Sequence, residues 1–419
     1  MPRIRPFNGV IYNQGKIKNL SKVVAPPYDI IPRDMQDRLY RASPYNIVRL
    51  ELNRITPSDD AKDNRYTRAG RFFDSWLKKR IMVRDGKESI YVYSQKYKAL
   101  GKSVERIGFI ALMEIEAKGG KKVLPHENTL AAPKTDRLSL MREVKANLSP
   151  IFVLYEDSQH EILKILKKAC AKGKPFADVM FEGVRNRAWR IGDRLDIKKI
   201  TRLMAGKDTF IADGHHRFEV SRMYSNEVSG ESSKYVMVYF VETSENMLTV
   251  LPAHRLVIDI GDLTKEEIKS RLAKHFRVEK IPSLKAVMSK LDRLQSSHVF
   301  GMYLGKGEFH VLTLKDMKAV DEVIKDKPSS WKRLDVSILH LFIFQHALGI
   351  RDDDDNIEFV KSPQETAELV DKRKFKAAFF LNPTKVAEVK RIARLGEKMP
   401  RKATYFYPKP ISGVVINKH

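Results

Sequence analysis

Strand-like apolar runs alternate with amphipathic helical patterns along this chain, and the alternation constrains its fold more than any other feature. Ile151–Tyr155 and Thr209–Ala212 are short apolar runs typical of buried strands, whereas Ser58–Arg80 and His160–Lys172 carry apolar residues at helical spacing. No internal repeat or low-complexity segment accompanies the pattern, so solenoids and propellers are excluded. The sequence therefore predicts a mixed α/β chain of the α+β class.

The length of the chain predicts more than one domain. A chain of 419 residues is too long for one ordinary hydrophobic core. A turn signal at Asp85-Gly86 and the end of a strand pattern before Asn246 divide it. We therefore expect an N-terminal α+β region over 1–85, a middle domain over 86–245 and a C-terminal α+β domain over 246–419.

The composition is that of an ordinary globular protein, with 42% hydrophobic and 31% charged residues. No apolar run approaches the roughly 18 residues that a membrane span needs, and the start of the chain lacks the apolar stretch of a signal peptide. The single cysteine, Cys170, excludes an internal disulfide and a multi-cysteine metal site. We expect a cytoplasmic protein with no membrane partner.

The formal net charge of +26 indicates an anionic partner of some kind. Lysines and arginines are spread along the chain, with no block of five or more and no separate basic tail. Such a spread is typical of solvated surface, and its positive field would draw phosphate-bearing substrates into a cleft. Nucleic-acid binding remains an alternative that the charge alone supports.

The stretch Asp213-Gly214-His215-His216-Arg217 is the strongest candidate site. It lies where a predicted buried strand ends and a helix begins, a usual place for phosphate sites because backbone N–H groups are free there. Gly214 permits a sharp turn or a close approach to a ligand. Asp213 could bind Mg²⁺ or cap the helix, and His216 and Arg217 could neutralise phosphate charge. The competing interpretation is an aspartate cap beside two surface histidines.

The second candidate is Pro125-His126-Glu127-Asn128-Thr129, which also follows a predicted strand. The proline stiffens the turn and places a histidine and a carboxylate directly after it. A glutamate in a partly dry cleft can acquire a raised pKa and act as a general base toward a hydroxyl group. Taken alone, this motif is equally consistent with a polar loop.

Further polar residues surround these two motifs in the sequence and complete the predicted site. Within the two motifs, we expect catalytic roles for His126, Glu127, Asp213 and His216. We expect phosphate or nucleotide contacts from Gly214, His215 and Arg217 and, outside the motifs, from Lys134, Arg137, Arg142, His254 and Arg255. Contacts to the substrate are expected from Thr129, Asn147 and Ser149.

Several catalytic signatures are absent from the sequence. It contains no G-x-x-x-x-G-K-[ST] loop, no G-x-G-x-x-G, no G-x-S-x-G and no H-E-x-x-H. Standard P-loop NTPases, Rossmann dehydrogenases, α/β-hydrolases and zincins are therefore excluded.

Six stretches resemble a large bacterial and archaeal family, the domain-of-unknown-function 1015 family, along nearly the whole chain. They are VVAPPYD at 23–29, SPYNIVRLEL at 43–52, VLPHENT at 123–129, NLSPIF at 147–152, DGHHR at 213–217 and MPRKATYFYPKP at 399–410. The closing stretch usually has Gln and Ser where this chain has Arg401 and Ala403, which separates these two positions from the family's pattern.

The pairing of PHE with a later DGHHR is similar to the free serine kinases of the ParB/sulfiredoxin fold. The resemblance implies a ParB/sulfiredoxin-like catalytic domain over 86–245. It also implies that Glu127 is the base acting on the serine hydroxyl, and that Asp213, His216 and Arg217 handle metal and phosphate. The segment between the two motifs is longer here, so the serine contacts are not carried over.

The sequence and its resemblances together predict a small-molecule kinase that gives O-phosphoserine from free L-serine. The phosphoryl donor is left open among ATP, ADP and pyrophosphate, and Mg²⁺ is the expected cofactor near Asp213. Two alternatives remain, namely a nucleic-acid- or nucleotide-binding regulatory protein of the same fold, and a kinase with another small hydroxy- or amino-acid acceptor.

Overall fold

The chain forms two compact units in a computed structural model, which describes residues 3–116, 119–120, 122–129, 131–244, 247–353 and 355–419. The first unit contains the chain up to Pro125, Thr129–Thr249 and Pro408–His419, and the second contains His126–Asn128 and Val250–Tyr407. The predicted regions 1–85 and 86–245 lie in the first unit except for His126–Asn128, and the last twelve residues of the chain also belong to the first unit. The expected α+β class is confirmed, because both units combine helices with sheets.

The helices of the first unit are α1 (Arg33–Ala42), α2 (Val48–Glu51), α3 (Arg65–Lys78), α4 (Ala131–Val144), α5 (Glu161–Lys172), α6 (Arg194–Met204) and α7 (His215–Glu227), with 3-10 turns η1 (Leu20–Lys22), η2 (Tyr28–Ile30) and η3 (Ser232–Lys234). Its strands are β1 (Ile4–Arg5), β2 (Val10–Tyr12), β3 (Met82–Arg84), β4 (Ile90–Ala99), β5 (Lys102–Glu114), β6 (Val123–Leu124), β7 (Ala146–Asn147), β8 (Ile151–Tyr155), β9 (Ala177–Phe181), β10 (Val184–Ile191), β11 (Thr209–Asp213), β12 (Tyr235–Glu242) and β21 (Asn417–Lys418). Strand β13 (Thr249–Leu251) begins at Thr249, where the segment Thr129–Thr249 of this unit ends.

A nine-stranded mixed sheet organises the first unit, in the order β6-β11-β8-β12-β5-β4-β10-β9 with β1 paired to β5. The pairs β6–β11 and β8–β12 are parallel, whereas the other pairs are antiparallel. In the β6–β11 pair, Leu124 lies opposite Phe210. Both strands therefore leave the sheet at the same edge.

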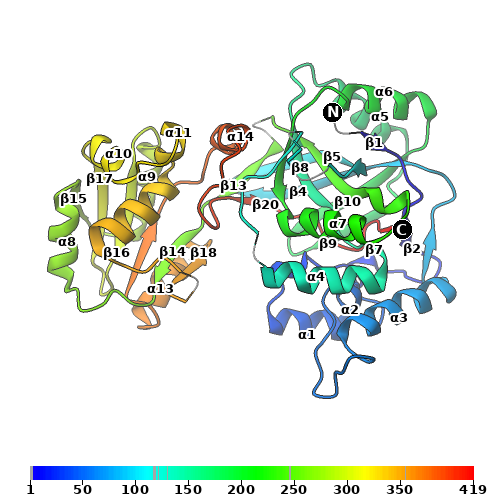
Figure 1. The fold of residues 1–419 in the computed structure, drawn as a ribbon, viewed down its shortest axis with the longest axis horizontal. Helices are drawn as coiled ribbons and strands as arrows, with labels where there is room; N and C mark the ends of the chain where they lie inside the picture. Colours follow the sequence, from blue (N-terminus) through cyan, green and yellow to red (C-terminus); the bar gives the residue numbers. More distant parts are fainter. Residues whose placement is uncertain (1–2, 117–118, 121, 130, 245–246, 354) are drawn as a thin grey trace. The chain divides into compact units, whose positions relative to one another are not determined.

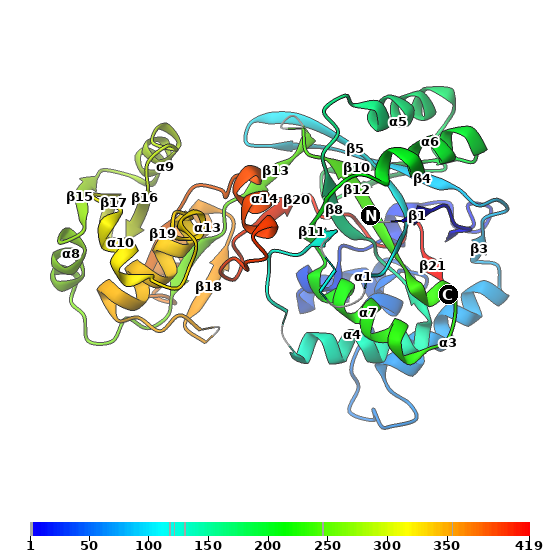
Figure 2. The ribbon, with the colours of Figure 1, turned by 45° about the horizontal axis from the view of Figure 1, so that its top comes forward.

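Helices cover this sheet (Figures 1 and 2), and their apolar side chains contribute to its hydrophobic cores. Residues Ile162, Leu166 and Ile200 of α5 and α6 pack on the alternate residues of β4, β5, β8 and β12 that point to their side. The N-terminal helices form a second core with α4, and α4 lies beside α7. The polar turn between β11 and α7 therefore joins two elements that are packed in the hydrophobic core.

The second unit is built on a six-stranded antiparallel sheet in the order β15-β17-β16-β19-β14-β18. The six strands of this sheet are β14 (His254–Val257), β15 (Phe276–Ile281), β16 (Val299–Tyr303), β17 (Phe309–Leu314), β18 (Ile357–Val360) and β19 (Ala377–Phe380). The second unit also contains β20 (Tyr405–Tyr407), which lies outside this sheet. Its helices are α8 (Lys265–Ala273), α9 (Leu284–Arg293), α10 (Lys318–Val323), α11 (Ser329–Lys332), α12 (Asp335–Ser337), the π-helix η5 (Ile338–Leu348), α13 (Pro363–Asp371) and α14 (Val386–Arg394).

Alternation along the strands gives the sheet of the second unit two packed faces. On β19, Ala378 and Phe380 join α9 and α13 in one core, while Phe379 packs edge-on against Phe344 of η5, with ring centroids 5.0 Å apart. The central strands β16 and β19 are therefore fully buried, whereas the edge strand β15 is mostly exposed between its two ends.

Two sequence-based assignments are corrected by the structure. The helix predicted over Ser58–Arg80 begins only at Arg65, because the Asn64 side chain accepts hydrogen bonds from the backbone N–H groups of Tyr66 and Thr67 and caps α3. The apolar start of the stretch at 23–29 predicts a short strand ended by two prolines, but the structure has only one isolated bridge there, between Ala25 and Ser412, next to two 3-10 turns. The paired prolines explain this, since proline lacks the N–H that a ladder needs.

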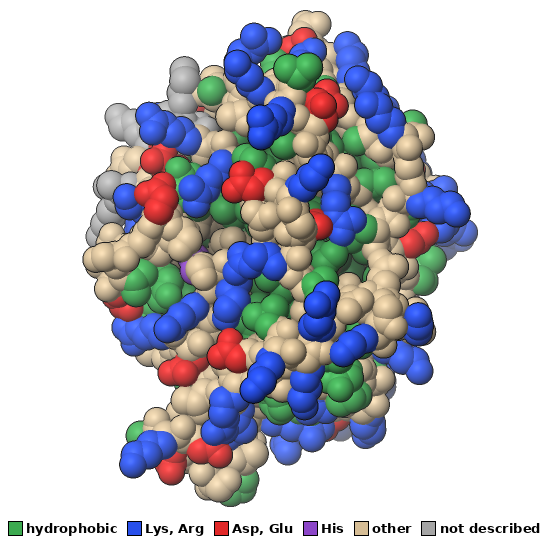
Figure 3. Space-filling view, turned by 90° about the vertical axis from the view of Figure 1, so that its right-hand side faces the viewer, with side chains coloured by type: hydrophobic (Ala, Val, Ile, Leu, Met, Phe, Trp, Pro, Cys, Tyr) green, Lys and Arg blue, Asp and Glu red, His purple; other side chains and the backbone are tan. Residues whose placement is uncertain are grey.

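Charge is spread over the surface as the sequence predicted. Figure 3 shows lysine and arginine side chains over most of the face it draws, with acidic side chains among them. Within the part of the chain that the structure describes, no helix combines the length and the apolar character that crossing a bilayer requires.

Candidate functional site

The turn from Asp213 to Arg217 joins β11 to α7 in the first unit, as the sequence predicted. β11 ends at Asp213, α7 begins at His215, and Gly214 between them adopts the left-handed conformation with φ of 92°. A Cβ atom at Gly214 would lie 3.0 Å from Nη2 of Arg217. Glycine is therefore needed both for the backbone angle and for the return of the Arg217 side chain over the turn.

The Asp213 carboxylate is held between two cations. Its Oδ2 accepts a hydrogen bond from Nη2 of Arg217 at 2.6 Å, and its Oδ1 lies 2.6 Å from Nζ of Lys409. Lys409 also pairs with Asp29. Burial lowers the pKa of Lys409, but the Asp213 and Asp29 carboxylates outweigh burial, and the pKa rises above its usual value.

Arg217 is anchored on its other side by the segment before β8. Its Nη1 donates to Oγ of Ser149 at 3.0 Å and to the carbonyl oxygen of Pro150 at 2.6 Å. Its side chain is only 11% exposed. Burial lowers the pKa of Arg217, while Asp213, Asp29 and Glu51 raise it, and the net shift is upward. Arg217 therefore remains a cation held in a fixed position.

A buried carboxylate continues this network into the N-terminal region. Ser149 donates to Oε1 of Glu51 at 2.8 Å, and Nη1 of Arg137 donates to the Glu51 carbonyl oxygen at 2.6 Å. Glu51 is 3% exposed. Burial raises its pKa, and the charges of Arg137 and Arg217 oppose the rise. Arg137 also pairs with Asp136 and stacks on Tyr28, 4.1 Å from the ring centroid.

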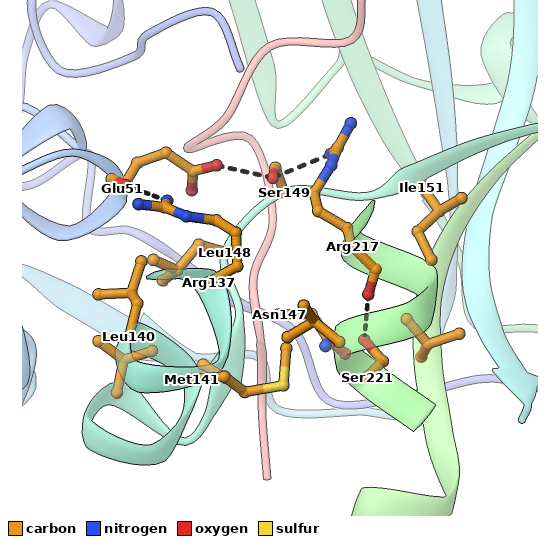
Figure 4. Close-up of a pocket in the computed structure, with 14 residues that line it drawn as sticks. Glu51, Arg137, Leu140, Met141, Asn147, Leu148, Ser149, Ile151, Arg217 and Ser221 are labelled. Carbon is orange, nitrogen blue, oxygen red and sulfur yellow. Dashed lines mark hydrogen bonds between the residues drawn. The ribbon is translucent and has the colours of Figure 1, made fainter. Parts of the chain in front are cut away.

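A small cavity lies against this network (Figure 4). About 40 Å³ is open to the centres of water-sized groups, where one water needs about 10–15 Å³. Most of its walls are apolar, and its polar lining is supplied by Glu51, Arg137, Asn147, Ser149, Arg217 and Ser221. Four of these six residues, Arg137, Asn147, Ser149 and Arg217, were predicted as site residues from the sequence.

The other predicted residues of the first unit have varied surroundings. Arg142 is exposed and forms two hydrogen bonds to Glu227, at 2.7 and 2.8 Å, which tie α4 to α7. Lys134 is half-buried on α4, and Thr129 is half-buried before it. His215 is buried and His216 is half-buried in the first turn of α7.

Glu127 and His126 belong to the second unit. The fully buried His126 ring has its Nε2 3.0 Å from Oγ1 of Thr404, and its carbonyl oxygen accepts a hydrogen bond from the Met399 amide at 2.8 Å. The Glu127 side chain is 29% exposed, and its Oε1 lies 3.5 Å from the Thr404 hydroxyl. The partnership of Glu127 with the Asp213–Arg217 turn stays a prediction.

His254 and Arg255 lie in β14, inside the second unit. Both are fully buried. Burial and the neighbouring Arg255 lower the pKa of His254 to about 3, so its imidazole is neutral at pH 7. Nε of Arg255 donates to Nε2 of His340 at 3.0 Å. In these surroundings neither side chain reaches solvent, and their predicted phosphate contacts remain untested.

Sequence reasoning missed Lys409, Asp29 and Glu51. Each lies in a stretch that resembles the family, at 399–410, 23–29 and 43–52, and this was the signal that could have found them. Lys409 is positioned by a buried clamp, in which Arg106 donates to Gln95 and to the Pro408 carbonyl oxygen, while Nε2 of Gln95 donates to the Lys409 carbonyl oxygen at 3.2 Å.

A magnesium ion has no prepared protein cage at Asp213. Both carboxylate oxygens already face a cation, and among the described residues no three His, Cys, Asp or Glu side chains gather as a metal site. Mg²⁺ usually keeps several waters and binds through one or two carboxylates together with substrate phosphates. The residues present therefore do not fit an ion held by the protein alone, and the predicted metal role of Asp213 stays a prediction.

The sequence matches one family model, and the structure is similar to several solved structures. The family model described as "Protein of unknown function (DUF1015)" matches residues 4–337. No curated protein matches the chain.

Among solved structures, the chain is similar to a free serine kinase in complex with AMP, at 14% identity and a TM-score of 0.36, over 71% of this chain and 86% of that one. It is also similar to a mutant of a free serine kinase in complex with ADP, at 12% identity and a TM-score of 0.37, over 72% of this chain and 89% of that one. A conserved hypothetical protein from Pyrococcus furiosus matches at 12% identity and a TM-score of 0.36, over 74% and 94%.

Proposed function

Because the chain belongs to the DUF1015 family, whose function is unknown, its activity must be inferred from its residues, and we propose a small-molecule kinase that phosphorylates free L-serine. The phosphoryl group would pass from ATP, ADP or pyrophosphate to the serine hydroxyl oxygen. O-phosphoserine and the shortened donor would be the products.

One observation in the first unit carries this proposal. The parallel strands β6 and β11 pair with Leu124 opposite Phe210, so both chain segments leave the sheet at one edge. The chain reaches Asp213 three residues after Phe210, and it reaches Glu127 three residues after Leu124. Ligands of α/β proteins commonly bind beyond the carboxyl ends of parallel strands. The register therefore supports a shared role for the two motifs.

In the proposed reaction, Glu127 accepts the proton of the serine hydroxyl while the hydroxyl oxygen attacks the terminal phosphorus of the donor. The bond between phosphorus and the leaving oxygen breaks as the new one forms. The N-terminal turn of α7, with His215 and His216, faces the negative charge of the phosphoryl group. Arg217 and Lys409 fix the turn, since both are engaged by Asp213. Mg²⁺ would enter bound to the donor phosphates and offset their charge.

The experiment that tests the proposal is a search for the product. The full chain is incubated with L-serine, Mg²⁺ and each of ATP, ADP and pyrophosphate, and phosphoserine is detected by phosphorus NMR and mass spectrometry. We expect product with at least one donor. Product with none of the three would overturn the assignment to a serine kinase.

A second candidate function, nucleic-acid binding, is favoured by the surface of α5 and α6. These two neighbouring helices carry eight exposed cations, and within the described residues none of the eight forms an ion pair: Lys164, Lys167, Lys168, Lys172, Arg194, Lys198, Lys199 and Arg202. Contacts to phosphates would make retention of duplex DNA fall steeply with salt. Fluorescence anisotropy with a labelled duplex at several salt concentrations checks this, and absence of binding at low salt would remove the candidate.

A further inference from the structure

Glu51, which lines the cavity beside Arg217, carries one oxygen atom that its surroundings leave unsatisfied. Oε1 of Glu51 accepts the hydrogen bond from Ser149, but Oε2 is buried and has no hydrogen-bond partner among the described residues. A buried carboxylate oxygen without a donor costs free energy unless water or a ligand supplies one. The Glu51 side chain lines the cavity together with Ser149 and Arg137 (Figure 4).

The cavity also contains donors for an anionic group. A guanidinium has five N–H donors. In the described residues, Arg137 stacks on Tyr28, and its hydrogen bonds and ion pairs are to the Glu51 carbonyl oxygen and the Asp136 carboxylate. These involve Nε, Nη1 and Nη2 once each. Two N–H donors remain for a ligand. One wall of the cavity thus pairs an acceptor for a cation with a donor for an anion.

The remaining walls limit the size and polarity of an occupant. They consist of aliphatic side chains and Met141, with Leu140 and Val144 on α4, Val220 on α7 and Ile151 on β8. The open space is equivalent to about three waters, which suits a compact ligand and excludes a long side chain.

We propose that this cavity binds a small α-amino acid, with the ammonium group on Glu51 and the carboxylate on Arg137. An α-amino acid carries its two charges within a few bonds of each other, as the cavity carries the complementary pair. The inference rests on the proposed function, in which it assigns the acceptor pocket. It also adds Glu51 as a residue that determines specificity, which neither motif had indicated.

Binding of ligands that lack one charge tests the assignment. Calorimetric titration of the full chain with L-serine, ethanolamine, which lacks the carboxylate, and 3-hydroxypropionate, which lacks the ammonium group, needs no phosphoryl donor. L-serine should bind at least 10-fold more tightly than either analogue. Equal binding of 3-hydroxypropionate would overturn the role of Glu51, and no binding of L-serine would mean that the cavity holds only water.

Two substitutions sharpen the test. Glu51→Gln keeps the shape and the Ser149 contact but removes the charge, and it should weaken L-serine binding at least 10-fold. Glu227→Gln, which removes a carboxylate from α7 outside the cavity, is the matched control and should bind as the unaltered protein does. If Glu51→Gln fails to fold, Leu140→Phe fills the cavity from an apolar wall and should also abolish binding. Unchanged binding in either cavity variant would overturn the proposal.

The outcome is separable from that of the kinase proposal. If L-serine binds but no donor yields phosphoserine, the pocket stands and the assigned reaction fails. If phosphoserine forms and Glu51→Gln leaves the KM for serine unchanged, the reaction stands and the pocket fails.

Discussion

Two arginines that were predicted to contact phosphate, Arg217 in the first unit and Arg255 in the second, have opposite surroundings. Arg217 touches the Asp213 carboxylate directly, at 2.6 Å, and its pKa is raised. Arg255 donates to the neutral acceptors His340 and the Lys402 carbonyl oxygen, at 3.0 and 3.3 Å. Burial lowers the pKa of Arg255 to about 9, although the charge of Asp352 opposes it. The pKa of the buried arginine is thus raised where a carboxylate touches it directly, and lowered where its hydrogen-bond partners are neutral.

The difference lies in how the buried charges are paired in the two units. Around Arg217, Asp213 and Lys409, each charge meets an opposite charge at hydrogen-bonding distance. Around Arg255, the nearest acid is reached through a histidine, since Nδ1 of His340 lies 2.7 Å from Oδ1 of Asp352. Direct pairing thus fixes the charges around Asp213 in the first unit, whereas Arg255 in the second unit is held by neutral acceptors.

The largest expected effect comes from removing each arginine in turn. Arg217→Met should lower the free energy of unfolding by about 3–5 kcal/mol, because it breaks a buried ion pair and leaves Ser149 and Pro150 without their donor. Arg255→Met should cost only about 1–2 kcal/mol, the loss of hydrogen bonds to neutral groups. Urea unfolding followed by circular dichroism measures both. A larger cost for Arg255→Met would break the comparison.

An intermediate effect is expected for Lys409→Met, which leaves Asp213 and Asp29 without their shared cation. The cost should be about 2–3 kcal/mol at pH 7. It should shrink as the pH falls toward about 4, the ordinary pKa range of carboxyl groups, because a carboxyl group that has taken up a proton no longer needs a cation. Unfolding free energies of the variant and the unaltered protein at pH 7 and 4.5 check this. A deficit that does not change with pH would contradict the ionic account of Lys409.

The smallest effect at neutral pH is expected for His254→Leu in the second unit. The folded-state pKa of His254 is lowered to about 3 against about 6.5 in the unfolded chain, so between these values the unfolded state binds the extra proton. This contribution to stability is complete above pH 6.5 and is lost by up to about 1.4 kcal/mol per unit as the pH falls toward 3. The leucine variant should show a shallower acid dependence. An unaltered slope would show that His254 is not neutral and buried in the folded state.

The sequence predicted the elements that form around the turn because their signals are local. The apolar run before Asp213 and the helical pattern after His215 are the observed β11 and α7, with Gly214 between them in the conformation that glycine favours. Arg217 and Ser149 were also selected, and they lie in hydrogen-bonding contact. Local periodicity and turn chemistry were sufficient for this part of the site.

The rest of the site depends on contacts between distant parts of the chain, which no local pattern encodes. Lys409 lies in the C-terminal segment and contacts Asp213. Glu51 lies at the end of α2, where the residues directly before and after it are leucines, and it contacts Ser149. Arg106 and Gln95 look like ordinary strand residues, yet they clamp the segment that carries Lys409. Tertiary pairing decided these positions. The stretches that resemble the family contain Lys409 and Glu51, but neither Arg106 nor Gln95.

The central claim, that Glu127 is the base of a serine kinase, is tested most directly by the rate of phosphoserine formation in Glu127→Gln. The amide preserves the size of the side chain and an oxygen that can accept from Thr404, but it cannot take up the serine proton. Glu114→Gln, at a half-exposed carboxylate on β5, is the matched control. We predict a loss of about 10²–10⁴-fold in kcat for Glu127→Gln, with an unchanged melting temperature and a fully active control. Full activity in Glu127→Gln would contradict the account.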